Sequence, residues 1–222
     1  MAKIIGNLIC QNGISEVVRA IESVAPLVDE YYVVDGFSTD GTWEWLNKWK
    51  DVYHLTLFQN KFENMAEQRN FILDKTPKEC WIITIDQDEK LGELAQLSLK
   101  QFVDSIEILP SIYPKVIPIP LLNLVGDIKH HEDGVCYNSN KVFWYEEGIT
   151  FKGGYHSYLS KEGSKEQYFV YQCPDNWGIM HYAWLDKDRV EKVKQDVAEG
   201  KRDYKEYKDG FKPREVLTLN II

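Results

Sequence analysis

The segment from Trp81 to Ile85, followed at once by Asp86-Gln87-Asp88-Glu89, is the part of this sequence that most limits the possible folds. It is an apolar run of strand length, which is typical of a strand buried on both faces of a parallel sheet. In open α/β sheets, ligands bind at the carboxyl ends of the strands. The acidic residues therefore stand where such a fold would place a binding site.

Apolar strands and helical patterns alternate along about the first 110 residues. This alternation predicts βαβ units and a mostly parallel sheet. Ser15 is the expected cap of the first helix. The strands are expected at residues 3–9, 31–34, 53–58 and 81–85, and the helices at 15–24, 42–48 and 65–73.

The second half has a mixed pattern, with a turn at 146–148 between two short strands. We expect an α/β protein with one domain, 1–222, in which a nucleotide-binding half (1–110) is joined to an acceptor-binding half (111–222) that carries a C-terminal helix. The expected elements of this half are three extended stretches and one charged helix, at residues 116–125, 142–145, 150–151 and 186–207.

Composition excludes several classes of protein. The net charge of −9 argues against non-specific binding to nucleic acid or anionic membranes. The N-terminal apolar run is too short for a signal peptide, and no stretch approaches a membrane span, so we expect a cytoplasmic protein that meets any lipid-linked partner at the membrane surface. The cysteines lack a C-x-x-C pair and are expected to be buried thiols: Cys10, Cys80, Cys136 and Cys173.

Asp86 and Asp88 alternate along an extended chain, so the end of a sheet would project both carboxylates toward one side. Two oxygen ligands on one edge suit Mg²⁺ or Mn²⁺ that also binds a diphosphate. The alternative is a solvated acidic turn after a strand.

Arg69 lies in the expected helix "AEQRNFIL". Its planar guanidinium is suited to a phosphate group or a base edge. The alternative is a surface arginine paired with Glu63 or Glu67.

In "DGFSTDGT", Thr39 or Asp40 can cap the helix that begins near Trp43. Asp35 lies at the end of the preceding strand, before a cap is needed. Capping therefore explains Asp40 better than Asp35.

Other polar and aromatic clusters have ordinary explanations. The run at 130–133, with two histidines, is best interpreted as a polar loop, and the aromatic-flanked His156 and His181 as core residues unless other signals join them. The tryptophans at 43, 45 and 49 fit helix packing. Signatures of P-loop ATPases, dehydrogenases, zinc metalloproteases and α/β-hydrolases are absent.

The order of the motifs is more specific than any one of them. "CQNG", "ISEVVRAIESV", "VDEYYVVDGFSTDGT", "AEQRNFIL" and "WIITIDQDE" follow one another at short intervals. This series resembles the family 2 glycosyltransferases with the GT-A fold, and in particular the small bacterial-type group that includes lipopolysaccharide-core glucosyltransferases. The resemblance covers residues 3–92 and continues more thinly through "KVFWYEEGITFKGGYHSYL" and "GIMHYAWLDKDRVEKV".

The resemblance implies a donor site for a UDP-sugar, for example UDP-glucose, and a glycan or glycoconjugate acceptor. Asp35 would contact the base, Arg69 would face the base and the diphosphate, and Asp86 would hold the ribose. A Mn²⁺ or Mg²⁺ ion would be held by Asp88, with His181 as a further metal or phosphate contact. The remaining donor-binding candidates are Cys10, Gln11, Asn12 and Gln87.

The resemblance also implies an inverting transfer, in which a base takes the proton of the acceptor hydroxyl. The group often has His-Glu where this chain has His156-Ser157, so the identity of the base is open. His156 ranks first among the candidates, and the alternatives are Glu146, Glu147 and Asp175. Two other functions stay open: a sugar nucleotidyltransferase, and a binding module without turnover.

Overall fold

The computed structural model of the chain describes residues 2–124, 130–132, 138–154, 157–162, 164, 167–182, 185 and 213–215. The helix expected at 186–207 lies outside the described residues, as do Cys136 and His156.

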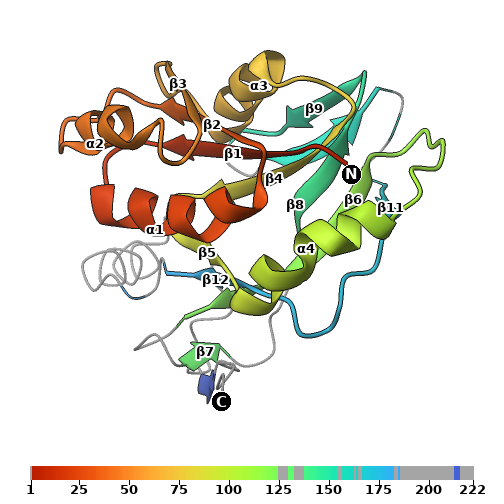
Figure 1. Cartoon of the computed structure of the whole chain (residues 1–222). Coiled ribbons are helices and arrows are strands. Elements are labelled where there is room, and N and C mark those ends of the chain that lie inside the picture. The colour runs from red at the N-terminus through yellow and green to blue at the C-terminus, as the bar shows by residue number, and fades with distance from the viewer. Residues whose placement is uncertain are drawn as a thin grey trace, which may run out of the picture.

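A mixed sheet forms the centre of the molecule (Figure 1). Its first half is parallel, in the order β3-β2-β1-β4, with β1 at Ile4–Cys10, β2 at Glu30–Asp35, β3 at Leu55–Gln59 and β4 at Cys80–Asp86. The order continues through β8-β6-β12-β5, with β8 antiparallel to both β4 and β6. These later strands are β5 (Glu89–Leu91), β6 (Lys115–Asn123), β8 (Asn138–Tyr145), β12 (Ile179–His181) and β11 (Phe169–Val170), which pairs with β6.

Helices cover both faces of the parallel strands, and this explains the apolar run of β4. Ile83 packs into a core cluster with Val17 of α1 and Leu99 of α4, whereas Ile82 packs into a second cluster with Ile72 of α3. Successive strand residues point to opposite faces, so a strand covered on both sides has no polar face. The helices are α1 (Ile14–Val24), α2 (Thr42–Trp49), α3 (Met65–Lys75) and α4 (Glu93–Ser105), with a 3₁₀ turn, η1, at Ala25–Leu27.

The prediction that Ser15 caps the first helix was wrong. α1 begins at Ile14 after Gly13, whose φ of 80° lies in the left-handed region that favours glycine. Asp40 lies 27 residues away in sequence and accepts hydrogen bonds from the backbone N–H groups of Gly13 (2.6 Å) and Ile14 (3.1 Å). A distant loop therefore supplies the cap that Ser15 was expected to provide.

The pairing of the short strands also differs from a simple hairpin. β9 (Ile149–Lys152) follows β8 across the turn at 146–148 but pairs with β10 (Tyr158–Lys161). Both edges of β8 are already hydrogen-bonded, to β4 and to β6, so β9 cannot add to it. A separate ribbon pairs β13 (Pro213–Glu215) with β7 (His130–Glu132).

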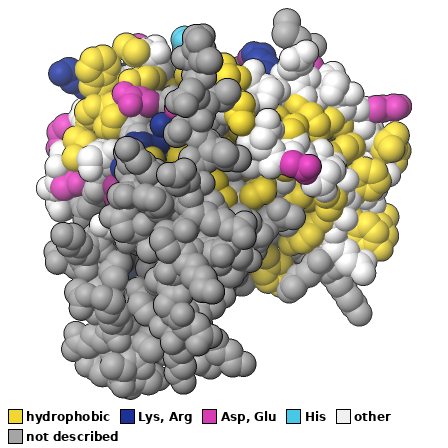
Figure 2. All heavy atoms as spheres, turned by 90° about the horizontal axis from the view of Figure 1, so that it is seen from below, with side chains coloured by type: hydrophobic (Ala, Val, Ile, Leu, Met, Phe, Trp, Pro, Cys, Tyr) yellow, Lys and Arg dark blue, Asp and Glu magenta, His cyan; other side chains and the backbone are white. Residues whose placement is uncertain are grey.

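The surface seen in Figure 2 exposes hydrophobic side chains on the side that carries α4 in Figure 1. Leu97, Leu109 and Ile112, in and just after α4, are exposed. Scattered exposed hydrophobic residues are ordinary on protein surfaces. Within the described part of the chain, no helix has the length and apolar character needed to cross a bilayer.

Candidate active site

The carboxyl ends of β2, β1 and β4 meet at one edge of the sheet. Asp35 on β2 is paired with Cys10 on β1, and Asp86 on β4 is paired with Ile9 on β1. Neighbouring strands lie about 4.8 Å apart, so the two aspartates are separated by roughly 10 Å. The sheet topology thus brings together residues that the sequence predicts for the base and for the ribose.

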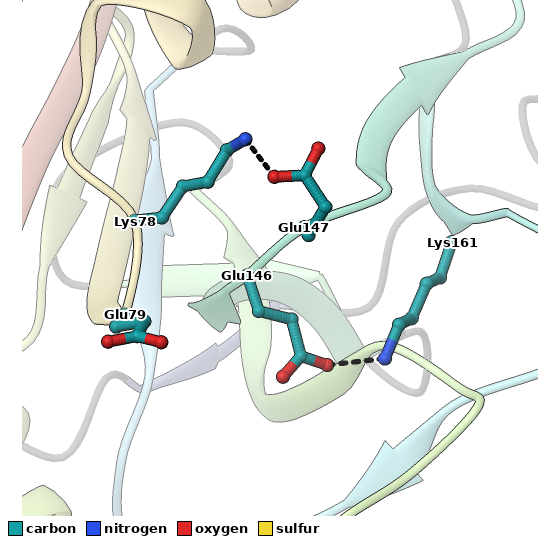
Figure 3. Close-up of a pocket in the computed structure, with 5 residues that line it drawn as sticks. All are labelled: Lys78, Glu79, Glu146, Glu147 and Lys161. Carbon is teal, nitrogen blue, oxygen red and sulfur yellow. Dashed lines mark hydrogen bonds and ion pairs between the residues drawn. The ribbon is translucent and has the colours of Figure 1, made fainter.

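Glu146 and Glu147, two of the alternative bases, do not lie at this edge. Figure 3 shows them beside Lys78, Glu79 and Lys161 around a cavity. Cys80, the first residue of β4, pairs with Tyr145, so β4 starts next to this cavity. Asp86 is the last residue of β4, at the opposite end of the strand. A strand of this length spans roughly 20 Å, so the structure separates both glutamates from Asp86.

Asp175 does not reach the edge either. It is exposed in the turn that precedes β12, on a segment whose Trp177 packs against Phe102 of α4. The structure therefore brings none of the three alternative bases to Asp86, and His156 lies outside the described residues.

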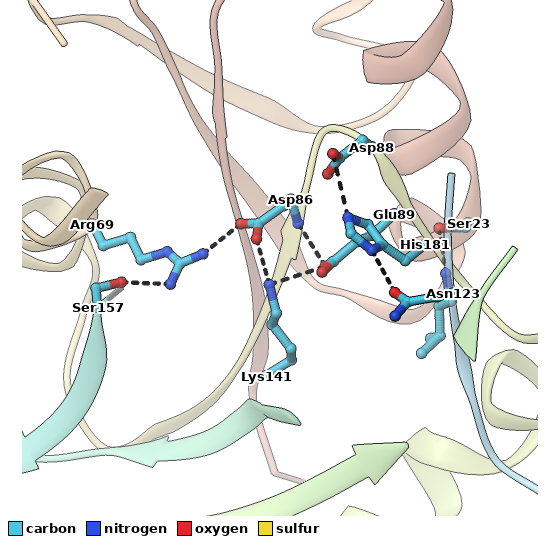
Figure 4. A network of polar contacts seen from close by, with 10 residues as sticks. Ser23, Arg69, Asp86, Asp88, Glu89, Asn123, Lys141, Ser157 and His181 are labelled. Atoms are coloured by element: carbon cyan, nitrogen blue, oxygen red, sulfur yellow. Dashed lines mark hydrogen bonds and ion pairs between the residues drawn. The ribbon is translucent and has the colours of Figure 1, made fainter. Parts of the chain in front are cut away.

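A buried ion network holds Asp86 in place (Figure 4). The Arg69 Nη2 donates to Asp86 Oδ1 at 2.5 Å, and the Lys141 Nζ donates to Asp86 Oδ2 at 2.6 Å. Lys141 also lies 3.0 Å from Glu89, which in turn accepts the Asp86 backbone N–H at 2.9 Å. The second Arg69 nitrogen, Nη1, donates to Ser157 at 2.7 Å. Arg69 is therefore a partner of Asp86, not of Glu63 or Glu67.

The pKa values of the two acids in this network are shifted in opposite directions. Burial raises the pKa of Asp86, but Arg69 and Lys141 outweigh burial and hold that pKa far below its usual value. Burial dominates at Glu89 and raises its pKa, although Lys141 opposes the shift. The pKa of Lys141 is raised, because Asp86 and Glu89 outweigh the burial that lowers it. Asp86 and Lys141 are therefore both charged at neutral pH.

Asp88 lies in the turn after Asp86 and faces a histidine from β12. His181 Nε2 lies 3.4 Å from Asp88 Oδ2, and His181 Nδ1 lies 2.8 Å from Asn123 Oδ1 (Figure 4). An amide oxygen only accepts hydrogen bonds, so Nδ1 is the donor, and in neutral imidazole Nε2 carries a lone pair. Two acceptors that face each other in this way need a proton or a metal cation between them.

The spacing of Asp88 and His181 fits a shared metal ion. Two ligand atoms bound about 2.1 Å from one ion, at a right angle, lie roughly 3 Å apart, close to the 3.4 Å observed. The Asn123 contact is the kind that fixes the orientation of a metal-binding histidine. Within the described ranges, no group of three or more His, Cys, Asp or Glu side chains is placed to hold a metal. A bound ion would therefore need further ligands from elsewhere, such as diphosphate oxygens.

Asp35 is fully buried, and its carboxylate accepts hydrogen bonds from the loop after β2 and from the end of β3. It accepts hydrogen bonds from the Ser38 hydroxyl, from the Ser38 backbone N–H at 3.0 Å, and from Gln59 Nε2 at 3.1 Å. In this arrangement Asp35 fixes the loop that follows β2.

The loop after β1 is bound to its neighbours on both sides. The backbone N–H of Gln11 donates to Gln87 Oε1 at 2.9 Å, and Thr39 donates its N–H to Asn12 Oδ1 at 2.8 Å. Cys10 is buried, and burial followed by the charge of Asp35 raises the pKa of its thiol. Cys10 is thus a structural thiol, whereas Gln11, Asn12 and Gln87 form the rim of the edge.

Asp40 caps two helices at once. Besides the start of α1, it accepts the backbone N–H (3.1 Å) and the hydroxyl (2.6 Å) of Thr42, at the start of α2. The expected capping role of Asp40 is confirmed, and this residue also ties α1 to α2.

The sequence alone did not identify Lys141 and Asn123 as residues of the site, and it gave no separate role to Glu89 or Ser157. Lys141 carried a signal, because a charged residue opens the otherwise apolar strand pattern Val142–Tyr145. A charged side chain is rarely buried without a partner, so this lysine predicts a buried acid nearby. Asn123 carried no comparable signal.

Comparison with known proteins identifies the type of fold. Residues 8–110 match the model of Glycosyl transferase family 2. No curated protein matches the chain in sequence. A mannosyltransferase, PcManGT from Pyrobaculum calidifontis in complex with GDP-Man and Mn²⁺, is similar in structure with a TM-score of 0.58 and 15% identity, over 92% of this chain and 65% of that one. S. aureus TarS 1-349 in complex with UDP-GlcNAc gives a TM-score of 0.54 and 16% identity, over 80% of this chain and 58% of that one.

These comparisons confirm the expected GT-A fold. At identities of 15% and 16% the structural similarity establishes the fold alone. The chain spans less than two thirds of the length of either solved structure.

Proposed function

We propose, from the Glycosyl transferase family 2 match over residues 8–110 and from the geometry around Asp86 and Asp88, that this chain is a metal-dependent glycosyltransferase. It transfers a sugar from a nucleotide-diphosphate donor, a UDP-sugar such as UDP-glucose, to a hydroxyl of a glycan or glycoconjugate. The resemblance to the lipopolysaccharide-core group remains part of this proposal, as do the inverting outcome, the cytoplasmic location and the division into donor and acceptor halves.

The donor lies across the carboxyl edge of β4, β1 and β2. Asp86 keeps room for the ribose, because a carboxylate has about four acceptor positions and Arg69 and Lys141 donate one hydrogen bond each. Those two cations also neutralise Asp86, which reduces its repulsion of an anionic donor. Arg69 is held by Asp86 and Ser157, and its guanidinium faces the diphosphate from there. Asp35 stays the proposed contact of the base at the end of β2, where it fixes the loop that would meet the base.

Asp88 and His181 hold Mn²⁺ or Mg²⁺ in this proposal. When bound, such an ion supplies positive charge for the oxygens of the leaving diphosphate. Asn123 keeps the His181 ring in the orientation that presents Nε2 to the ion. The Mn²⁺ in the similar mannosyltransferase complex supports the use of a divalent ion by this fold.

The transfer proceeds by attack of the acceptor oxygen on the anomeric carbon, opposite the diphosphate. The new C–O bond forms as the bond to the diphosphate oxygen breaks, and a base accepts the hydroxyl proton. His156 is the proposed base. Ser157, which follows His156 in the sequence, contacts Arg69, and this supports the choice.

One observation carries the proposal: Asp88 faces His181 next to the Arg69–Asp86–Lys141 network. This pair lies at the carboxyl end of β4, a strand within the matched residues 8–110. A thermal-shift screen of nucleotide-sugars, each with and without Mn²⁺, tests it. A bound ligand raises the free energy of unfolding by RT ln(1 + [L]/Kd), and the melting temperature rises with it. The true donor should therefore raise the melting temperature only when the metal is present.

Incubation of the best donor with a broad panel of acceptors then separates an enzyme from a binding module. Release of the nucleoside diphosphate with sugar transfer supports the proposal. Tight binding without any turnover would favour the module, and synthesis of a nucleotide-sugar from a sugar phosphate would favour a nucleotidyltransferase.

A further inference from the structure

Phe37 is an exposed aromatic residue in an unfavourable backbone conformation. Its φ is 63°, in the left-handed region, and the residue is 54% exposed. A bulky residue rarely adopts a positive φ. Neither hydrophobic core cluster of the described residues includes Phe37. Packing therefore does not explain why a phenylalanine occupies this position.

The residues on either side of Phe37 are firmly held. Gly36 donates its N–H to the carbonyl of Cys10 at 2.8 Å and accepts from Gln11 Nε2 at 2.7 Å. The Ser38 hydroxyl accepts the backbone N–H of Asn12 at 2.7 Å, and Ser38 itself is bound to Asp35. These bonds fix the loop around Phe37, so the surrounding structure imposes both the strain and the exposure. Strain that is imposed in this way is a reason to look for a function.

The position of the loop indicates what the ring could meet. Phe37 is the second residue after β2, whose carboxyl end lies two strand spacings from β4, or roughly 10 Å. With the diphosphate at Asp86 and Asp88, a nucleoside that extends across β1 brings its base to the end of β2. Bases stack on aromatic side chains because every base has a π-face.

We propose that Phe37 forms an aromatic wall against which the nucleobase of the donor stacks. This inference rests on the proposed function, because it requires a nucleoside diphosphate at the carboxyl edge. Phe37 stabilises the bound nucleotide at the expense of the free protein, which carries the strained residue and the exposed ring.

Calorimetry with the full chain in Mn²⁺ tests the proposal. The probes are UDP, GDP, ADP, CDP and inorganic diphosphate. The variants are Phe37→Gly, which removes the ring and the strain, and Phe37→Tyr, which keeps the ring. His54→Gly is the matched control, because His54 has a similar φ of 53° and is exposed in the turn before β3.

Phe37→Gly should weaken binding of the preferred nucleoside diphosphate by about tenfold. Its affinity for inorganic diphosphate should not change. Its melting temperature should be no lower than that of the wild type, since glycine tolerates a positive φ. Phe37→Tyr should bind within about twofold of the wild type. His54→Gly should change no dissociation constant.

Wild-type binding of the preferred nucleoside diphosphate by Phe37→Gly would overturn the stacking role and leave the proposed function intact. Equal weakening of nucleotide and inorganic diphosphate would also overturn it, because the ring would then act on the phosphates or on the loop. If the wild type binds no nucleoside diphosphate at all, the proposed function fails and this inference fails with it.

Discussion

Replacement of Lys141 by methionine should strongly destabilise the chain, because Lys141 is the cation shared by the buried Glu89 and the partly buried Asp86. Its side chain is 10% exposed, and those of Asp86 and Glu89 are 22% and 3% exposed. Methionine keeps most of the volume of lysine and removes the charge. The variant leaves Glu89 buried without its cation and leaves Asp86 with Arg69 alone.

The expected loss follows from this geometry. Removal of one partner from a buried ion pair costs about 3–5 kcal/mol. Asp86 keeps Arg69 and part of its exposure, so the lower end applies, about 3 kcal/mol. For a chain of this size that corresponds to a fall in Tm of roughly 6–12 °C.

The loss should also depend on pH. The folded-state pKa of Glu89 is raised above its ordinary value of 4.5, so the folded state binds more protons than the unfolded state above that pH. Stability therefore falls as pH rises through the folded pKa. Lys141→Met raises that pKa further, and its cost should be larger at pH 8 than at pH 5.

Urea unfolding at pH 5 and at pH 8 measures the stability that Lys141→Met loses. Lys3→Met is the matched control, because Lys3 pairs with Glu30 at 2.9 Å but the two side chains are 42% and 40% exposed, and such surface pairs contribute about 1 kcal/mol or less. A second change, Glu89→Gln, should recover part of the stability lost in Lys141→Met. Equal losses in Lys141→Met and Lys3→Met would refute the buried network as described.

Two further predictions concern the helix caps and the donor site. Asp40→Ala should cost about 1–2 kcal/mol at pH 7. The hydrogen bonds from Thr42 lower the Asp40 pKa from 3.8 to about 2. The stability that Asp40 contributes is therefore present above pH 3.8 and is lost as the pH falls toward 2. If urea unfolding gave the same stability difference between wild type and Asp40→Ala at pH 2 as at pH 7, the result would count against this role. Arg69→Lys should weaken nucleotide-sugar binding by about tenfold, because lysine cannot bind Asp86 and Ser157 with one planar group. The helical circular dichroism signal should not change. An unchanged affinity in calorimetry would exclude the role of Arg69 in donor binding.

Local sequence patterns predicted the parallel half of the fold well. The apolar run before Asp86 indicated a strand buried on both faces, and the structure shows it between two core clusters. The strand and helix boundaries predicted in this half lie within two residues of those observed. Periodicity and punctuation by Gly and Pro are local properties, so they are visible in a single sequence.

Long-range partners could not be predicted in the same way. β8 inserts antiparallel between β4 and β6, and this insertion brings Lys141 to Asp86 across 55 residues of sequence. No local pattern specifies that pairing. Ser15 stood at a favourable position for a cap, but the fold placed Asp40 closer to the free N–H groups of α1. α4 and β5 were not expected at all.

The same contrast between local patterns and long-range contacts explains which features of the site the sequence predicted. Asp35, Asp86 and Asp88 lie at strand ends that the sequence could place, and they share one edge. Their protein partners come from other elements, so the sequence did not show that the carboxylate of Asp35 is already occupied. The glutamates of the turn at 146–148 were candidates because they are close to His156 in sequence, and the structure separates them from Asp86.

The metal dependence of donor binding tests the account most directly. Calorimetry should compare the nucleotide-sugar selected by thermal shift with and without Mn²⁺, for the wild type, for Asp88→Asn and for the control Asp51→Asn, an exposed acid in the turn after α2. Chelation and Asp88→Asn should each weaken binding by about tenfold or more, because the diphosphate then lacks its cation, and Asp51→Asn should bind as the wild type does. Unchanged affinity after chelation would contradict the role of Asp88 and with it the proposed mechanism.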